Sequence, residues 1–150
     1  AKYPEYSRTV NWLLAKEELF NYNTASTHFE FFKSVKKHKK LLKDLILNLN
    51  DMKKKVIGYG ASTKGNVILQ YCKLYSKDLR FIVDVNKNKS NKYTPGSLIK
   101  ILGEKEIKKF KPDYMLVLPW HFKNFIIQKE KKYLNEGGKI IFPLPDIEIV

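Results

Sequence analysis

The sequence predicts an α/β fold, in which an open parallel sheet is flanked by helices and preceded by two further helices. From residue 54 onward, strand-like segments alternate with helix-like segments, and the strand segments are continuously apolar. Such strands are buried on both faces, as in a parallel sheet covered by helices. Right-handed crossovers then favour the strand order 3-2-1-4-5. The predicted domains are a helical connector over residues 1–52 and a sheet domain over residues 53–150.

The first helix is expected over residues 5–21, where Trp12, Leu13, Leu19 and Phe20 mark an imperfect apolar stripe. The next residues are rich in Asn, Thr and Ser and predict a break. Because the chain starts at Ala1 within this helical pattern and without Met, we expect it to be a piece of a longer protein.

The second helix is expected over residues 27–49. Thr27 and Glu30 have the form of a capping box, in which an acidic residue follows a hydroxyl by three positions. The lysine-rich run over 36–40 falls mostly on the outer face, and we interpret it as solvated. The apolar side chains then recur at helical spacing, at Phe29, Phe32, Val35, Leu42, Leu45, Ile46 and Leu49.

The sheet domain is expected to contain five strands and three helices, with either a sixth strand or a tail at its end. Glycines near residue 137 stop the last helix, and Pro95 followed by Gly96 predicts a type II turn. The strands are expected at 54–59, 79–85, 98–102, 114–119 and 139–144. The helices are expected at 61–75, 103–110 and 122–134. The first of these helices is expected to bury Val67, Ile68, Tyr71, Cys72 and Tyr75.

The formal net charge of +14 raises the question of a nucleic-acid partner. Lysine far outnumbers arginine, which occurs only as Arg8 and Arg80. Arginine is the residue suited to bidentate contacts with phosphates and bases. Asn, Ile, Tyr and Phe are also abundant, as expected from AT-rich codons, so part of the charge reflects genome composition. We therefore rank nucleic acid below a small phosphorylated ligand.

The remaining composition points to a cytoplasmic protein without a membrane role. The single cysteine, Cys72, rules out an intrachain disulfide and favours a reducing compartment. No apolar run is long enough to span a bilayer, and no signal-peptide pattern is present. Because no Cys/His cluster has zinc spacing, we expect no metal site.

The turn between the first strand and the next helix is the main candidate site. In an open parallel sheet the ligand crevice lies where the strand order reverses, which is at the carboxyl end of this strand. Glycines permit a tight turn and a close ligand approach, and the helix start offers N–H groups and a positive dipole end to a phosphate. Two hydroxyls and a lysine add further donors. The turn reads Gly58, Tyr59, Gly60, Ala61, Ser62, Thr63, Lys64 and Gly65.

This turn matches known phosphate loops only in part. The dinucleotide fingerprint has a third glycine where this chain has Thr63, and a Walker A loop would place Lys64 after Gly65 instead of before it. Asp84 ends the next strand roughly 20 residues later, where an acceptor for ribose hydroxyls is expected. The alternative is a glycine turn that only lets helix and strand pack, with Asp84 capping a loop.

Residues after other strands are expected at the same edge of the sheet. Trp120 follows the fourth strand and either stacks on a base or sugar or packs as a lid on the core. His121 either bonds a phosphate or hydroxyl or caps the next helix. Tyr93 and Pro95 are expected to arch over this edge. No catalytic constellation is identified, because the carboxylates lie in charged helix patterns and are expected to be solvated: Glu104, Glu106, Glu130 and Glu136.

Several segments of the sequence are distinctive: 55–66, Asp84, 92–96, 111–114, 118–122 and 137–145. Together they resemble the C-terminal domain of S-adenosylmethionine-dependent sugar C-methyltransferases. They occur in the family's order and cover about residues 54–146. The helices of residues 5–50 resemble the connector that leaves the methyltransferase domain in this family.

The resemblance implies a parent enzyme with a zinc-binding domain, a catalytic domain that binds S-adenosylmethionine, and a C-terminal Rossmann-like domain that holds a nucleotide-linked sugar. Such enzymes methylate a carbon next to the keto group of a deoxysugar nucleotide. This chain carries none of the family's zinc, methyl-donor or catalytic motifs, and His121 stands where the family has Asn or a similar residue.

We therefore expect a fragment that is inactive alone and binds no S-adenosylmethionine tightly. Its partners would be a nucleotide-linked sugar or another phosphorylated small molecule, and the N-terminal domains of the same polypeptide. Two alternatives stay open: a stand-alone nucleotide- or dinucleotide-binding regulatory module, and a basic nucleic-acid-interaction domain.

Overall fold

The computed structural model describes the backbone of residues 4–150 and the side chains of residues 7–150. The chain forms two compact units, of which the first ends at Lys37 and the second spans His38–Val150. The first unit holds helix α1 (Pro4–Leu19) and the start of helix α2 (Ala25–Asp51).

The predicted capping box at the start of α2 is wrong. The helix already begins at Ala25, and the Thr27 hydroxyl lies 3.1 Å from the Thr24 hydroxyl. The Glu30 carboxylate does not turn back toward Thr27 but accepts a hydrogen bond from Lys33 at 2.8 Å. Thr24 directly precedes the observed helix start, and its hydroxyl also lies 3.1 Å from the Ser26 hydroxyl. The spacing of Thr27 and Glu30 did not indicate this earlier start.

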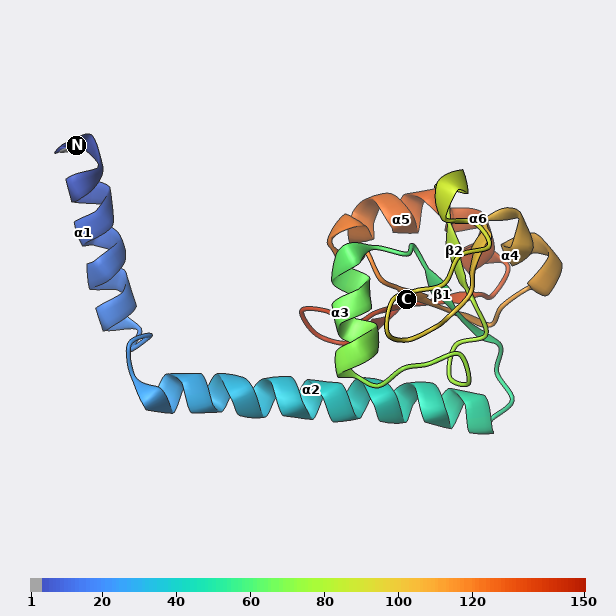
Figure 1. The fold of residues 1–150 in the computed structure, drawn as a ribbon, viewed down its shortest axis with the longest axis horizontal. Helices are drawn as coiled ribbons and strands as arrows, with labels where there is room; N and C mark the ends of the chain where they lie inside the picture. The colour runs from blue at the N-terminus through green and yellow to red at the C-terminus, as the bar shows by residue number, and fades with distance from the viewer. Residues whose placement is uncertain (1–3) are drawn as a thin grey trace. The chain divides into compact units, whose positions relative to one another are not determined.

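The second unit is built on a six-stranded sheet of the described residues, in the order β3-β2-β1-β4-β5-β6 (Figure 1). The first five strands pair in parallel, and β6 pairs antiparallel with β5. The predicted α/β class and the order 3-2-1-4-5 are confirmed, and β6 adds an edge strand. The strands are β1 (Val56–Tyr59), β2 (Ile82–Asp84), β3 (Ile101–Gly103), β4 (Tyr114–Val117), β5 (Lys139–Phe142) and β6 (Glu148–Ile149).

The helices of the second unit follow the predicted positions with one break. The single helix predicted over 122–134 is divided at Glu130, whose backbone has φ −97° and ψ 18°. The helix predicted over 61–75 ends earlier, with Cys72 as its C-cap. The helical segments are α3 (Thr63–Tyr71), η1 (Lys87–Lys89), α4 (Lys105–Phe110), η2 (Trp120–Phe122), α5 (Lys123–Lys129) and α6 (Lys131–Asn135).

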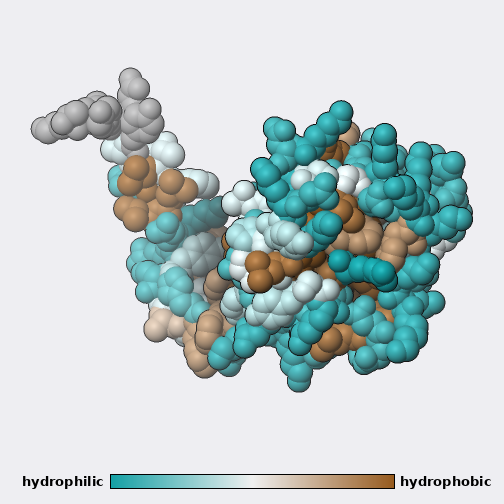
Figure 2. All heavy atoms as spheres, turned by 45° about the vertical axis from the view of Figure 1, so that its right-hand side comes forward, coloured by the Kyte–Doolittle hydropathy of each residue, from teal (hydrophilic) through white to brown (hydrophobic). Residues whose placement is uncertain are grey.

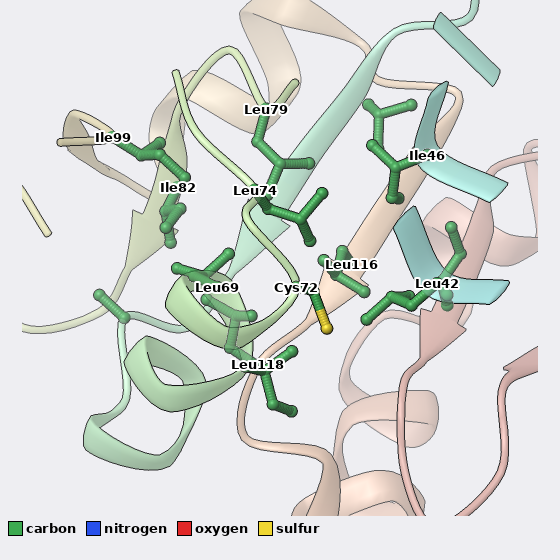
Figure 3. Packing of buried hydrophobic residues seen from close by; sticks show 14 of the residues in the cluster. Leu42, Ile46, Leu69, Cys72, Leu74, Leu79, Ile82, Ile99, Leu116 and Leu118 are labelled. Carbon is green, nitrogen blue, oxygen red and sulfur yellow. The ribbon is translucent and has the colours of Figure 1, made fainter. Parts of the chain in front are cut away.

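Helices cover both faces of the sheet, with α2 on one side and α5 and α6 on the other (Figure 1). Alternate residues of β1 enter different cores, because Val56 packs toward α2 and α3 whereas Ile57 packs toward α5. Figure 3 shows the first of these cores, where Leu42 and Ile46 of α2 lie near Leu116 of β4. This double burial explains why the strands are apolar throughout.

The inward face of α3 differs from the prediction. Ile68, Leu69 and Cys72 are buried, whereas Val67 is 66% exposed and Tyr71 is also exposed. The buried positions recur after one, three and four residues, which is the stripe of a helix that lies on a sheet. The prediction is therefore confirmed for Ile68 and Cys72 and wrong for Val67, Tyr71 and Tyr75.

Residues 38–51 of α2 belong to the second unit, since Leu42, Ile46 and Leu49 are buried in its core. The boundary at residue 52 stays a prediction, and the packing of α2 shows that its second half is part of the sheet's own core. The surface of the second unit, at the right of Figure 2, is mostly hydrophilic, with hydrophobic side chains between the polar ones. In the described part of the chain, no helix has the length and apolar character needed to cross a membrane.

Candidate functional site

A cleft of about 570 Å³ opens at the carboxyl ends of β1, β2 and β4. The strand order reverses between β1 and β4, which is where open α/β sheets bind their ligands. The wall of the cleft is largely apolar, and single polar groups stand within it. The apolar wall consists of Val83, Val85, Pro119, Phe122, Phe125 and Ile126.

The glycines of the turn after β1 are required by packing. A Cβ atom on Gly58 would lie 2.6 Å from Cγ1 of Ile82, and one on Gly65 would lie 2.5 Å from Cβ of Leu118. Gly60 has a φ of +79°, a conformation that L-residues with a Cβ rarely adopt. The turn therefore holds strand β1 and helix α3 closer to their neighbours than any larger residue would permit.

Protein acceptors already occupy the first amides of this turn. The Gly60 N–H donates to the Val83 carbonyl at 2.7 Å, and the Ala61 N–H donates to Oδ2 of Asp84 at 2.8 Å. The Ser62 N–H donates to the Gly60 carbonyl at 2.8 Å. These three amides therefore stabilise the turn itself and are not free to bind a phosphate.

The next two amides remain available at the start of α3. Ser62 is the N-cap of this helix, and its Oγ accepts a hydrogen bond from the Gly65 N–H at 3.0 Å. Among the described residues, the Thr63 and Lys64 amides have no protein acceptor. Both residues are exposed, and only Ser62 of this group lines the cleft. An anion could be bound here by two N–H groups and the positive end of α3.

Asp84 lies in the cleft, but its carboxylate is largely engaged. Oδ2 accepts from the Ala61 N–H at 2.8 Å and from Nζ of Lys89 at 3.2 Å, and Oδ1 accepts from the Asn86 N–H at 2.7 Å. A carboxylate has about four lone-pair positions, so a single position remains. Asp84 therefore cannot accept hydrogen bonds from both hydroxyls of a ribose. Its hydrogen bonds instead connect the glycine turn to the loop after β2.

Tyr59 forms a polar cluster on the other side of the cleft. Its hydroxyl donates to Oε1 of Glu130 at 2.8 Å and lies 3.3 Å from Oε1 of Glu104. Lys129 forms an ion pair with Glu104 and lies 5.6 Å from the centroid of the Tyr59 ring. Burial raises the pKa of Tyr59 far above its ordinary value, and the hydrogen bond to Glu130 and the nearby negative charges raise it further. Tyr59 is therefore a protonated donor near neutral pH.

The expectation that all four helix carboxylates are solvated is thus wrong for Glu104 and Glu130. Sequence reasoning also missed Lys89, which lines the cleft and donates to the Ala61 carbonyl at 2.9 Å. No spacing rule links these residues to the turn, because each comes from a different loop or helix. In the described residues, no group of three or more His, Cys, Asp or Glu side chains could hold a metal ion.

Replacing Tyr59 with phenylalanine is expected to lower the free energy of unfolding by about 1 kcal/mol. The charged acceptors alone would suggest more, but the side chain of Glu104 is 34% exposed and can be rehydrated. Tyr133→Phe is the control, since its hydroxyl donates at 3.2 Å to the neutral Lys139 carbonyl. Urea unfolding should show a smaller loss for Tyr133→Phe, and equal losses would contradict the role of the two carboxylates.

Trp120 and His121 lie at the predicted edge but not in the cleft wall. Trp120 is partly buried and packs against both core clusters. His121 is exposed, and its ring centroid lies 4.3 Å from that of Phe122. The neighbours Pro119 and Phe122 line the cleft instead. This packing of Trp120 corresponds to the lid-on-core interpretation.

Tyr93 and Pro95 lie away from the cleft. Tyr93 pairs with a residue before β3, and the Pro95 carbonyl accepts from Nε2 of Gln70 on α3 at 3.0 Å. Gly96 has the predicted positive φ, at +73°. The Ser97 N–H donates to the Pro95 carbonyl at 2.9 Å and the Leu98 N–H donates to the Thr94 carbonyl at 3.0 Å, so these two bonds close the turn around Gly96. This segment therefore lies against the flank of α3.

Comparison with known proteins adds two findings. A family model described as "C-methyltransferase C-terminal domain" matches residues 1–145. Over 146 residues, the chain is 33% identical to the C-methyltransferase NovU of Streptomyces niveus. This match covers 97% of the chain but 35% of NovU, so the chain spans about a third of the length of that relative.

Proposed function

Because the chain belongs to the C-methyltransferase C-terminal domain family, we propose that it is the substrate-holding domain of an S-adenosylmethionine-dependent C-methyltransferase. Its ligand is a nucleotide-linked sugar or another phosphorylated small molecule, whose nucleotide end occupies the cleft. Methyl transfer takes place in the remainder of the polypeptide, and this domain alone is inactive. We further propose a cytoplasmic location, in keeping with the single buried thiol.

The chemistry of the cleft carries this proposal. Phe122 and Phe125 are 56% and 64% exposed, and both line the cleft. Stacking of a base on an aromatic side chain contributes on the order of 1–3 kcal/mol. Nζ of Lys89 in the cleft wall is paired with Asp84 and the Ala61 carbonyl and keeps one N–H donor for a ligand. The amides of Thr63 and Lys64 supply further N–H donors nearby. Apolar walls with a few placed cations and donors suit a base joined to a diphosphate.

S-adenosylmethionine is not the ligand proposed for this cleft. The family resemblance places its site in the catalytic domain, whose motifs this chain lacks. We therefore propose that the methyl donor binds elsewhere in the polypeptide. When bound, it supplies the methyl group, while this domain holds and orients the acceptor.

Calorimetric titration of residues 1–150 tests these proposals. We expect a nucleoside-diphosphate sugar to bind and S-adenosylmethionine to give no measurable heat.

Phe125→Ala should weaken binding of the nucleotide sugar by roughly tenfold, through loss of stacking. Lys64→Ala should also weaken it by roughly tenfold, because a charge-assisted hydrogen bond contributes about 1.5–3 kcal/mol.

Two matched variants serve as controls. Val67→Ala removes a side chain that is as exposed as Phe125 but lies outside the cleft wall, and Lys37→Ala removes one exposed charge from the lysine-rich run. Equal weakening by Lys64→Ala and Lys37→Ala, abolished in high salt, would attribute binding to overall charge. Micromolar binding of S-adenosylmethionine would overturn the assignment and favour a self-contained methyl-donor site.

A further inference from the structure

Another pocket, of about 410 Å³, lies at the other end of the strands from the cleft. It is formed by residues 53–55, which lead into β1, by residues 76–80, which lead toward β2, and by Phe110 at the end of α4. It is therefore at the amino ends of these strands, whereas the cleft is at their carboxyl ends. Five cationic side chains line it: Lys53, Lys54, Lys55, Lys77 and Arg80.

The positive charge of this basic pocket is compensated by no ion pair within the described residues, and the nearby Asp113 carboxylate accepts a hydrogen bond from the Lys55 backbone N–H at 2.7 Å. None of the five cations forms an ion pair there. The carboxylate in the wall, Asp78, is 3% exposed, and its Oδ2 lies 2.8 Å from both Nζ of Lys43 and the Tyr75 amide. Its charge is therefore already neutralised, and crowding of like charges favours the binding of an anion.

Two of the cations are held in place by one aromatic ring. The guanidinium of Arg80 lies 5.2 Å from the centroid of Phe110, and Nζ of Lys55 lies 5.5 Å from it. The same Nζ donates to the Phe110 carbonyl at 3.4 Å. A positioned guanidinium offers a rigid fork of donors that matches two oxygens of a phosphate.

We propose that the basic pocket binds a compact, multiply charged phosphate anion with two or three linked phosphates. Five uncompensated cations exceed what a single phosphate, with a charge of about −2, would neutralise. The limited volume of the pocket favours a compact anion over an extended chain. This site does not depend on the proposed ligand of the cleft, because the two share no lining residue.

Titration with inorganic tripolyphosphate tests the proposal on residues 1–150. We expect one bound anion, with amide shifts in the NMR spectrum confined to residues 53–55 and 76–80. Arg80→Ala should weaken binding by roughly tenfold or more, since a charge-assisted hydrogen bond and its fork are lost. Lys77→Ala is a second variant that leaves the contact between Arg80 and Phe110 intact and should also weaken binding.

Lys131→Ala is the matched control, because Lys131 is exposed, forms no ion pair among the described residues and lies outside the pocket. Equal weakening by Lys131→Ala and Lys77→Ala would reduce the effect to overall charge and overturn the proposal. Amide shifts at Thr63 and Lys64 alone would place the anion at the start of α3, beside the cleft, and would also overturn the proposal. Tighter binding of a single-stranded DNA oligonucleotide at equal salt would replace it with a nucleic-acid surface.

Discussion

Gly60→Ala is expected to lower the free energy of unfolding by about 2–5 kcal/mol, because two separate costs fall on the same new Cβ atom. The φ of +79° costs a residue with a Cβ about 1–2 kcal/mol. The Cβ would also lie 2.7 Å from both Cδ and Cγ of Pro119, and overpacking of this kind costs about 1–3 kcal/mol. The proline ring cannot rotate away. Urea unfolding followed by circular dichroism measures the loss.

Alanine variants at three other glycines allow the strain cost and the contact cost to be measured separately. Gly58→Ala introduces only the close contact with Ile82, and Gly137→Ala introduces only strain, since Gly137 has a φ of +89° and open space around its Cβ position. Gly103→Ala introduces neither and should change stability little. The loss for Gly60 should approach the sum of the strain and contact costs. A loss for Gly60→Ala no larger than that for Gly137→Ala would show that Pro119 adapts and that packing at the cleft floor is loose.

The strand order could be predicted because it follows from local patterns and one chirality rule. Each of the five parallel strands is an apolar run, and right-handed crossovers leave few arrangements. For the end of the chain, the sequence left a sixth strand and a tail as alternatives, because two exposed residues show no periodicity; pairing with β5 makes them the strand β6 (Glu148–Ile149). The division of the last helix at Glu130 was equally hidden, since residues 122–134 contain no helix-breaking residue. It coincides with the contact between the Glu130 carboxylate and Tyr59.

The location of the cleft could also be predicted, whereas the hydrogen-bond partners of its polar side chains could not. Topology placed Asp84 at the correct strand end. Its hydrogen bonds come from Lys89 and two amides, whose positions depend on the conformation of loops. Tyr59 belongs to the predicted turn, but side chains of a strand alternate between faces. It therefore points toward α5 and meets Glu104 and Glu130, which are distant in sequence.

The segment with Tyr93 and Pro95 shows the limit of reasoning from strand ends. It follows β2 in the chain, which suggested that it lies over the cleft. It instead returns along the flank of α3, where Gln70 donates to the Pro95 carbonyl and Gly96 leaves room for the Gln70 side chain. A connection of this length is positioned by its own hydrogen bonds, and the strand it follows determines only where it starts.

The buried thiol of Cys72 is expected to make the stability of the protein depend strongly on pH above about pH 8. Cys72 is 2% exposed and lies among Leu69, Leu74, Leu116 and Leu118 (Figure 3). Burial raises the pKa of this thiol from its ordinary value of 9.0 to about 11, and the charges of two nearby lysines oppose the shift only in part. At pH values between these two pKa values, the Cys72 thiol is ionised in the unfolded chain but protonated in the folded chain. The thiol therefore contributes stability that is fully present below about pH 9 and is lost as the pH rises to about 11.

The wild-type protein is thus expected to lose about 2 kcal/mol more stability than Cys72→Ala between pH 8 and pH 11, since one pKa unit corresponds to about 1.4 kcal/mol. Urea unfolding of both proteins across this range measures the difference in slope, which is independent of the packing lost in the variant. The raised pKa values of Tyr59 and Tyr133 also lower stability at alkaline pH. Both proteins share that loss, so it drops out of the comparison. Parallel curves for the two proteins would mean that the folded thiol ionises as readily as the unfolded one, and hence that water reaches Cys72 within the core.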